Sequence, residues 1–406
     1  MRFLVLGINY APELTGIGKY TSEMAEWLIA RGHDVQVVTA PPYYPAWRVG
    51  EGYSAWRYRR EMVAGVHVWR CPLWVPLEQP GLKRVLHLAS FALSTLPVVL
   101  WQGLRWRPDV VWVVEPAFFS TLGAWLAARL GNAKAWLHVQ DFEIDVAFDL
   151  ELLPISWLRR GVTAFERWIM HRFDRVSTIS ERMLEQLAGK GVDAPRRFFF
   201  PNWVDAEKIY PLPDPNPLRA ELLIAPDTIV ALHAGNMGEK QGLEIVVEVA
   251  RALGNHHYLQ FILCGDGAAR KRLLQLADGL PNVRFLPVQP AERLNELLNL
   301  ADIHLLPQRA DSVDRVMPSK LTGMLASGRP VVATAHPCTQ VAQVVAGRGI
   351  VTPPGDAVAL TKAILHLATR PAERAQLGQA ARAFALAHWS REEILRRFEE
   401  EIGRLG

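Results

Sequence analysis

The sequence predicts an α/β protein made of two doubly wound, Rossmann-like domains. In both halves of the chain, apolar runs of strand length alternate with segments of helical periodicity, a pattern typical of parallel sheets covered by helices. The length of 406 residues exceeds one ordinary core, and six prolines between positions 201 and 226 indicate a linker. We expect an N-terminal domain over 1–200, a hinge over 201–226, a C-terminal domain over 227–386, and a terminal helix over 387–406 that packs back on the N-terminal domain.

Composition narrows the class of protein. Half of the residues are hydrophobic and the formal net charge is only +4, so nothing indicates a nucleic-acid partner. The three cysteines are scattered, which predicts neither a metal site nor a disulfide framework and suits a reducing compartment. The first residues look like a strand rather than a signal peptide. We expect a cytoplasmic protein, and its basic pI of 9.0 is compatible with the inner face of the plasma membrane.

The N-terminal half opens with a βαβ unit. An apolar strand over 3–7 leads into a loop with Gly16 and Gly18, then a helix over 19–30 and a second strand over 35–39. Open α/β sheets bind ligands at this end of the first strand, and the two glycines would let a ligand approach the backbone. A tight turn is the alternative. The dinucleotide fingerprint is absent, because its third glycine and its acidic residue are missing.

Residues 41–60 form a long loop rich in proline, aromatic residues and arginine. Loops of this length are usually functional or disordered. Tyr43, Tyr44 and Trp47 are therefore candidates for holding an acceptor substrate.

The segment 82–105 is apolar and carries no fixed charge between Val85 and Trp101. Basic residues flank it, with Lys83 and Arg84 at its start. It is either a buried domain helix or a surface helix that enters the headgroup region of a membrane. In the second case Lys83 and Arg84 would contact the acceptor or the membrane.

Further buried strands are predicted over 107–115 and 135–138, with a helix over 119–130 between them. His138 and Asp141 follow at the carboxyl end of a central strand, where a cleft is expected. They are candidate catalytic residues. A hydrogen-bonded core histidine is the alternative for His138.

The C-terminal half repeats the alternation, with strands over 229–234, 259–264, 283–286 and 303–306. Glycine-rich turns follow the first two strands, and a helix starting near Lys320 has free N–H groups and a lysine in its first turn. Two lysines and amide-rich turns at neighbouring strand ends suit a diphosphate with its nucleoside. The candidate residues are Gly235, Asn236, Gly238, Lys240, Gly265, Asp266, Gly267, Pro318, Ser319, Lys320 and Leu321.

Six sequence motifs stand out: Gly-Asn-Met-Gly-Glu-Lys-Gln-Gly at 235–242, Gly-Asp-Gly at 265–267, Pro-Ser-Lys at 318–320, Leu-Ala-Ser-Gly-Arg-Pro-Val-Val at 325–332, Arg-Pro-Asp-Val-Val at 107–111 and Pro-Asn-Trp-Val-Asp at 201–205. Together they resemble family 4 GT-B glycosyltransferases along essentially the whole chain, and in particular bacterial exopolysaccharide, colanic-acid and O-antigen enzymes. The resemblance implies two domains facing across a cleft. It also implies retaining transfer from a nucleotide diphosphate sugar, GDP-fucose-like or a UDP-sugar, to a lipid-linked or growing polysaccharide.

The resemblance assigns roles to several residues. Lys240 matches the lysine that neutralises the diphosphate, His138 matches a histidine near the reacting carbon, and Gly16 and Gly18 fall in the donor-binding set. By register with Lys320, Arg315 and Gly323 occupy the positions of the family's glutamate pair, which leaves the ribose contacts unassigned. Arg315 is kept among the candidate donor-binding residues.

No Asp-x-Asp pair occurs in the sequence, so we expect neither a metal nor a cofactor. The alternatives to a transferase are a non-catalytic protein that binds sugar nucleotides and a sugar-nucleotide epimerase.

Overall fold

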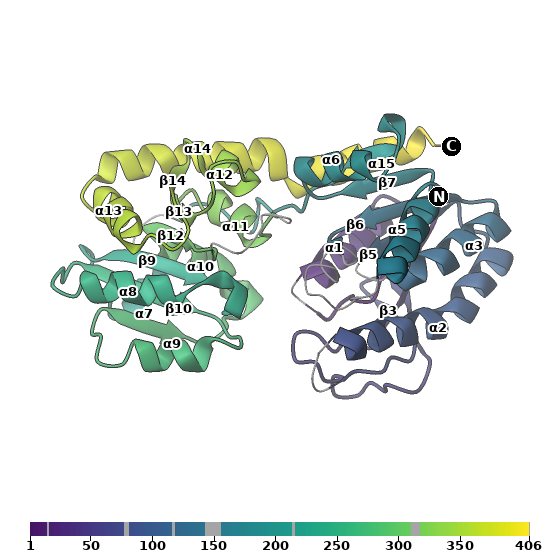
Figure 1. The fold of residues 1–406 in the computed structure, drawn as a ribbon, viewed down its shortest axis with the longest axis horizontal. Coiled ribbons are helices and arrows are strands. Elements are labelled where there is room, and N and C mark those ends of the chain that lie inside the picture. Colours follow the sequence, from purple (N-terminus) through teal and green to yellow (C-terminus); the bar gives the residue numbers. More distant parts are fainter. Residues whose placement is uncertain are drawn as a thin grey trace. The chain divides into compact units, whose positions relative to one another are not determined.

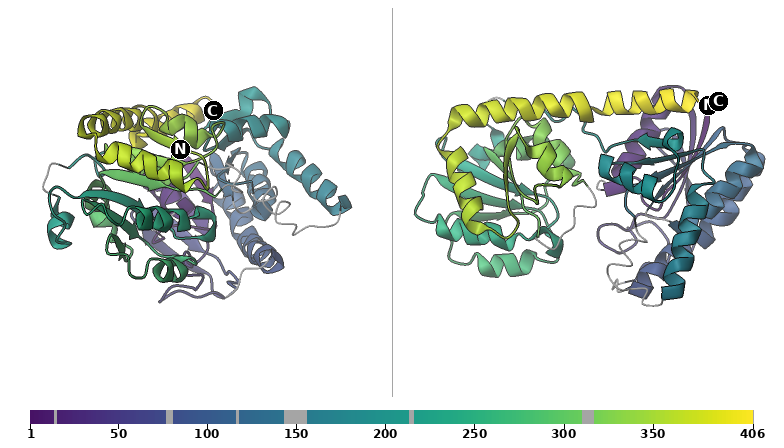
Figure 2. Two further views of the ribbon diagram at one scale, coloured as in Figure 1. Left: turned by 60° about the vertical axis from the view of Figure 1, so that its left-hand side comes forward. Right: turned by 45° about the horizontal axis from the view of Figure 1, so that its top comes forward.

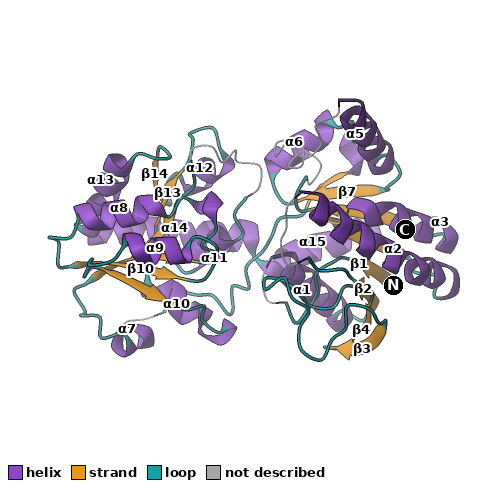
Figure 3. Ribbon diagram, turned by 60° about the horizontal axis from the view of Figure 1, so that its bottom comes forward, coloured by secondary structure: helices purple, strands orange, loops and turns teal. Residues whose placement is uncertain are grey.

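The chain folds into two compact units, each described here by itself (Figure 1). The computed structural model describes residues 1–13, 16–76, 81–115, 118–142, 156–212, 216–309 and 317–405. The first unit comprises Met1–Pro201 and Leu395–Gly406, and the second comprises Asn202–Ile394. Each consists of a sheet flanked by helices (Figure 3), wholly parallel in the second unit and parallel except for one edge hairpin in the first, so the predicted α/β class with two doubly wound units is confirmed.

The sheet of the first unit has eight described strands in the order β3-β4-β2-β1-β5-β6-β7-β8. All neighbouring strands pair in parallel except β3 with β4, which form an antiparallel hairpin at one edge. The central strands β1 and β5 are almost wholly buried, because helices cover both faces. The strands are β1 (Arg2–Leu6), β2 (Asp34–Thr39), β3 (Arg59–Val63), β4 (Val66–Arg70), β5 (Val110–Glu115), β6 (Lys134–Val139), β7 (Arg175–Thr178) and β8 (Arg197–Phe199).

Two helices of this unit are joined by unusually close backbone packing. At Gly103 in α2, an added Cβ would lie 2.5 Å from the carbonyl oxygen of Ala127 in α3, so only glycine allows this approach. The apolar segment predicted over 82–105 is therefore a helix fixed along α3. The described helices of the unit are α1 (Gly16–Ala30), α2 (Gly81–Arg105), η1 (Phe118–Ser120), α3 (Thr121–Gly131), α5 (Ser156–Met170), α6 (Glu181–Gly189) and η2 (Ala194–Arg196).

The sheet of the second unit has six described strands in the order β11-β10-β9-β12-β13-β14, all parallel. Its core is aliphatic, as the continuous apolar runs predict. The strands are β9 (Ile229–Ala234), β10 (Leu259–Cys264), β11 (Val283–Leu286), β12 (Ile303–Leu306), β13 (Val331–Thr334) and β14 (Gly349–Thr352). The helices are α7 (Pro217–Glu221), η3 (Glu239–Gln241), α8 (Glu244–Ala252), α9 (Arg270–Leu276), η4 (Ala291–Arg293), α10 (Leu294–Leu300), α11 (Lys320–Ala326), α12 (Gln340–Val345), α13 (Ala357–Ala368), α14 (Pro371–Trp389) and α15 (Arg391–Gly403), which runs on into the first unit.

The chain leaves the first unit and returns to it beside the junction of α14 and α15. The N–H of Val204 donates to the carbonyl of Trp389 at 2.8 Å, and Arg391 forms an ion pair with the buried Asp205 at 2.8 Å. The Pro-Asn-Trp-Val-Asp motif thus connects the start of the second unit to the junction of α14 and α15. Figure 2 shows α15 following α14 at the C-terminal end of the chain.

The end of α15 packs within the first unit. The Phe398 ring lies 5.0 Å from the Trp136 ring and stacks on Phe200 at 4.7 Å. Glu401 accepts a hydrogen bond from the Arg175 guanidinium at 2.7 Å. The terminal helix is therefore held by aromatic contacts and ion pairs together.

Candidate functional site

The glycine turns that follow β9 and β10 touch each other. An added Cβ at Gly265 would lie 2.0 Å from the carbonyl oxygen of Gly235, and one at Gly267 would lie 2.6 Å from Oδ1 of Asn236. The N–H of Met237 donates to the carbonyl of Asp266 at 2.8 Å. Gly265 and Gly267 have φ angles of 141° and 150°, which favour glycine. These glycines are therefore required for turn-to-turn packing, whatever else binds there.

The first of these turns continues into the one-turn helix η3. Gly238 precedes it and Gly242, with φ of 63°, ends it. The backbone of Lys240 lies within η3, whereas its side chain falls outside what the structure describes. The sequence segment with Arg315 also lies outside the described residues. The predicted roles of both side chains remain predictions.

Lys320, at the first position of α11, reaches the turn after β9. Its Nζ donates to Oε1 of Gln241 at 3.0 Å, and an added Cβ at Gly235 would lie 3.6 Å from its Cδ. The residue is only half-buried overall, yet desolvation of the ammonium lowers the pKa of Lys320 to about 8. Within the described ranges, no carboxylate lies at ion-pair distance from Lys320. The site therefore holds a cation whose described partner is a neutral amide.

The residues just before and after Lys320 differ in burial. Leu321 is fully buried in the core of the second unit, Pro318 is half-buried, and Ser319 is exposed and makes no cap hydrogen bond. Because α11 spans only Lys320–Ala326, the lysine side chain, rather than a long helix dipole, carries the positive charge.

His233 lies near Lys320, at the penultimate position of strand β9 and two residues before Gly235. It is fully buried, and its Nδ1 lies 3.3 Å from the carbonyl oxygen of Leu305. Burial, and secondarily the charge of Lys320, lowers the pKa of His233 well below its ordinary value. His233 therefore adds no negative charge beside Lys320. His233 was not among the predicted site residues, although a histidine inside an apolar strand is a visible signal in the sequence.

In the first unit, His138 occupies an enclosed position on β6. Its Nδ1 lies 2.9 Å from Oγ of Ser177, and its ring stacks on Trp112 at 5.3 Å and packs against Phe200 at 5.2 Å. Burial lowers the pKa of His138 to about 3, so it is neutral. These are the surroundings of a hydrogen-bonded core histidine, the alternative kept open above. Asp141 lies three residues further on and is half-buried.

Glu13, in the loop between β1 and α1, orders the start of the 41–60 segment. One carboxylate oxygen accepts from the backbone N–H groups of Tyr43 and Tyr44, each at 2.8 Å, and the other accepts from Asn9 at 2.8 Å. An added Cβ at Gly18 would come within 3.3 Å of Glu13. Burial raises the pKa of Glu13 despite these donors. The sequence analysis did not single out this residue.

At the start of α1, Gly16 has a φ of 61° with nothing within 4 Å of an added Cβ. The positive φ of this turn is therefore enough to explain why residue 16 is glycine. Gly18 is buried.

The candidate acceptor aromatics lie in different environments. The Tyr43 ring is buried and packs on Trp47 at 5.5 Å and on His87 of α2 at 5.0 Å. Tyr44 is exposed, as are Lys83 and Arg84 in the first turn of α2. Tyr43 and Trp47 therefore connect the loop to α2, whereas Tyr44 faces solvent.

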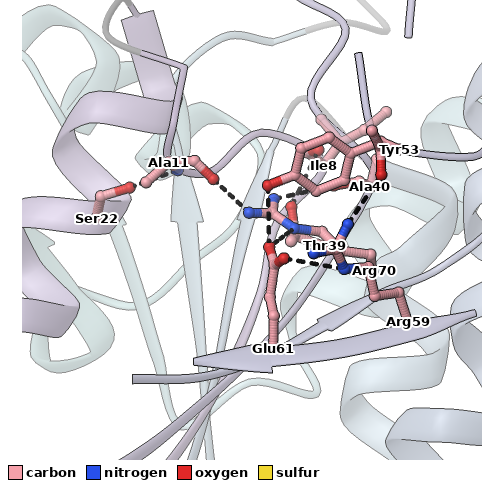
Figure 4. Close-up of polar contacts among 10 residues, drawn as sticks. Ile8, Ala11, Ser22, Thr39, Ala40, Tyr53, Arg59, Glu61 and Arg70 are labelled. Atoms are coloured by element: carbon pink, nitrogen blue, oxygen red, sulfur yellow. Dashed lines mark hydrogen bonds and ion pairs between the residues drawn. The ribbon is translucent and has the colours of Figure 1, made fainter. Parts of the chain in front are cut away.

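A buried arginine ties the end of β4 to this region (Figure 4). Arg70 pairs with Glu61 at 2.8 Å, donates to the carbonyl of Ala40 at 3.2 Å and also reaches the carbonyl of Ala11. The N–H of Ala11 in turn donates to Ser22 in α1 at 2.8 Å. Arg70 thus links the carboxyl ends of β2 and β4 to the loop after β1, a role that sequence reasoning did not find.

Among the described residues, no group of three or more His, Cys, Asp or Glu side chains could hold a metal ion. The expectation of a site without metal or cofactor stays a prediction.

Comparison with known proteins covers the whole chain. The model for a glycosyl transferase 4-like domain matches residues 15–203, and that for glycosyl transferases group 1 matches residues 228–370. The chain is 42% identical to the putative colanic acid biosynthesis glycosyl transferase WcaI of Escherichia coli (strain K12), over 99% of this chain and 100% of that protein.

Solved structures agree on the fold. Sucrose-phosphate synthase from Thermosynechococcus elongatus superposes with a TM-score of 0.78 at 18% identity, covering 100% of this chain and 99% of that one. Anabaena HepE, in complex with UDP and glucose, superposes with a TM-score of 0.71 at 16% identity, covering 100% of both chains. The shared architecture is the GT-B fold, which confirms the predicted fold class.

Proposed function

The chain belongs to the glycosyltransferase family defined by the 4-like and group 1 domains, and from this we propose that it transfers a sugar from a nucleotide diphosphate sugar to a bacterial polysaccharide precursor. The observation that carries the proposal is Lys320, a desolvated cation beside the glycine turn of β9 with a neutral described partner. The colanic-acid relative supports an exopolysaccharide product. The UDP and glucose bound to HepE support a nucleotide sugar donor.

The chemistry required of the second unit is stabilisation of negative charge. When the bond between the anomeric carbon and the diphosphate breaks, the charge on the departing oxygen rises, and a positive group already placed there lowers the barrier. Lys320 supplies such a group, and Lys240 on η3 supplies a second in the proposal. Because both charges come from side chains, the proposed reaction is independent of metal.

The proposed transfer retains the configuration of the sugar. The acceptor hydroxyl oxygen bonds to the anomeric carbon on the face from which the diphosphate departs. The bond between that carbon and the phosphate oxygen breaks, and the leaving phosphate takes the hydroxyl proton. His138 is neutral and enclosed, so its proposed contribution is to shape the end of β6 rather than to exchange a proton.

The proposed donor is a GDP-fucose-like sugar or a UDP-sugar, and the proposed acceptor is lipid-linked or a growing polysaccharide. With a nucleotide sugar donor and a lipid-linked acceptor, the proposed location is the cytoplasmic side of the plasma membrane.

The test is thermal stabilisation by GDP, UDP, ADP and dTDP, with wild type, Lys240→Ala and Lys271→Ala. Lys271 is an exposed lysine on α9 and serves as the matched control. At about 100 times its dissociation constant, one nucleotide should stabilise the folded chain by about 2.7 kcal/mol in wild type and control, but not in Lys240→Ala. Stabilisation by none of the four would refute the donor site.

Turnover separates the competing functions. A transferase consumes the matching sugar nucleotide only slowly until an acceptor is present. An epimerase converts it without acceptor, and a binding protein leaves it unchanged in both conditions.

A further inference from the structure

Helix α2 exposes a continuous apolar stripe. Leu82, Leu86, Leu93 and Leu104 fall within about 40° of one another at 100° per residue, and they are 72, 51, 72 and 53% exposed. The helix is long and apolar enough to cross a membrane by length and composition, yet only 33% of its most apolar 18-residue stretch is buried. A core helix of this composition would hide that stripe.

The opposite side of α2 is fixed to the first unit. Phe91 and Val99 are fully buried, and Gly103 meets the backbone of α3 at a distance that no other residue permits. Pro97 interrupts the hydrogen bonding of the helix. The helix is thus held lengthwise on the unit, over about 37 Å, with its leucine stripe turned outward.

A second exposed segment lies against α2 and combines aromatic with basic side chains. Residues 56–60 read Trp-Arg-Tyr-Arg-Arg, and Trp56 and Tyr58 are 75 and 50% exposed. The Tyr58 hydroxyl donates to the carbonyl of Ser94 in α2 at 2.9 Å. Tryptophan and tyrosine with an exposed face favour the boundary between water and lipid, because one end of each is apolar and the other polar.

Near the C-terminal end of α2, aromatic and basic side chains again lie together. The guanidinium of Arg60 lies 4.4 Å from the Trp69 ring, which packs edge-on against Trp101 of α2 at 6.0 Å. Trp101 is 48% exposed. Ser94 and Trp101 are α2 residues beside the stripe, so the 56–60 segment and Trp69 lie along its border. The stripe and this border together are called the α2–Trp56 surface.

The charge around this surface is positive. Between positions 56 and 107 the acidic residues are Glu61 and Glu78, and Glu61 pairs with Arg70 and Arg59. The basic residues at the borders of the surface are Arg57, Arg59, Arg60, Lys83, Arg84, Arg105 and Arg107. We propose that the α2–Trp56 surface docks on an anionic lipid bilayer, with α2 lying in the plane of the headgroups. An apolar stripe bordered by cations matches such a surface in both polarity and charge.

The apolar contribution is tested by vesicle co-sedimentation of the full chain, with vesicles of phosphatidylcholine alone or with about 30% phosphatidylglycerol. The double change Leu86→Gln with Leu93→Gln should lower the partition coefficient on anionic vesicles at least about tenfold. The matched control replaces Leu274 and Leu386, leucines of the second unit with 40 and 43% exposure. That control should bind as the wild type does.

The charge contribution has its own pair of variants. Arg57→Gln with Arg105→Gln should weaken binding to anionic vesicles at least about tenfold, because each cation near such a surface contributes about fivefold. Lys271→Gln with Lys362→Gln removes two exposed charges from the second unit and should change little. Equal binding of wild type to neutral and anionic vesicles would overturn the proposal, as would equal losses in test and control variants.

A second copy of the chain is the rival occupant of the stripe. Light scattering during size exclusion distinguishes it: a wild-type dimer that becomes a monomer in the Leu86/Leu93 variant, with vesicle binding unchanged, would replace the membrane by a dimer interface. No nucleotide is present in these assays. Failure of the membrane proposal therefore leaves the proposed transfer reaction standing, and failure of the donor site leaves the docking surface standing.

Discussion

Replacing Lys320 by methionine should stabilise the free protein and abolish nucleotide binding. Methionine keeps the length of the side chain and removes its charge. In the structure this charge is desolvated, and its described hydrogen-bond partner is the amide of Gln241, 3.0 Å away. If Lys320 only stabilised the fold, its replacement would instead destabilise the free protein and leave nucleotide binding unchanged.

The size of the effect follows from the pKa of Lys320, which desolvation lowers from 10.5 to about 8. This difference between the folded and unfolded pKa corresponds to about 3 kcal/mol. Partial exposure of the residue reduces this value, and losing the hydrogen bond to Gln241 costs about 1 kcal/mol. We expect a net gain of about 1–2 kcal/mol, or about 3–6 °C in melting temperature for a unit of this size.

The stability difference between wild type and Lys320→Met depends on pH. The folded pKa is the lower one, so the folded state carries the full penalty below pH 8, and the penalty disappears as pH rises toward 10.5. The melting temperatures of wild type and Lys320→Met should therefore differ at pH 7 and converge by about half at pH 9.5. Differential scanning fluorimetry with and without the stabilising nucleotide measures both effects. A variant that melts below wild type at pH 7 and still responds to nucleotide would refute this reasoning.

Three further predictions concern the two units. Nucleoside diphosphate affinity, measured by calorimetry, should be nearly constant between about pH 7 and 8, where the terminal phosphate is fully ionised, and fall by up to about tenfold per unit above that range, because Lys320 must then gain a proton to bind. Gly265→Ala should cost more than about 3 kcal/mol in urea unfolding, since its Cβ would lie 2.0 Å from the oxygen of Gly235, whereas Gly279→Ala, with φ of 75° and open space, should cost about 1 kcal/mol. His138→Ala should lower the free energy of unfolding by about 2–4 kcal/mol; an unchanged stability would mean that the buried ring is not a packing element.

The sheets of both units could be predicted because their strands are long runs of Val, Leu and Ile. β5 and β9 are buried on both faces, and continuous apolar runs are the sequence signal of that environment. The hairpin of β3 and β4 was missed. Its residues, from Arg59 to Arg70, lie at the sheet edge with many charged side chains, so they carry no such signal.

Contacts between residues distant in the sequence account for the other omissions. Glu13 acts on the backbone of Tyr43 and Tyr44, and Arg70 acts on the carbonyls of Ala11 and Ala40. In the sequence each looks like an ordinary charged residue of a loop or an edge strand. Only the fold brings the carboxyl ends of the strands together and buries these charges with their partners.

The glycine turns show how one pattern can have two causes. Gly265 and Gly267 were singled out as phosphate-binding, and the structure shows that turn packing alone already requires them. Their presence therefore says little about the ligand. Lys320 says more, because in the described part of the chain its ammonium is desolvated and its hydrogen-bond partner is a neutral amide.

The same reasoning bears on position 241. A carboxylate there would lie 3.0 Å from the Lys320 ammonium and satisfy it within the protein, so Gln241→Glu should stabilise the free chain. It should also weaken nucleoside diphosphate binding at least about tenfold, because the phosphates would meet an ion pair at Lys320 and would be repelled by the new charge. Calorimetric titration of the variant measures this loss. If affinity were unchanged while the melting temperature rose, Lys320 would not be the phosphate ligand, and its burial would need another explanation.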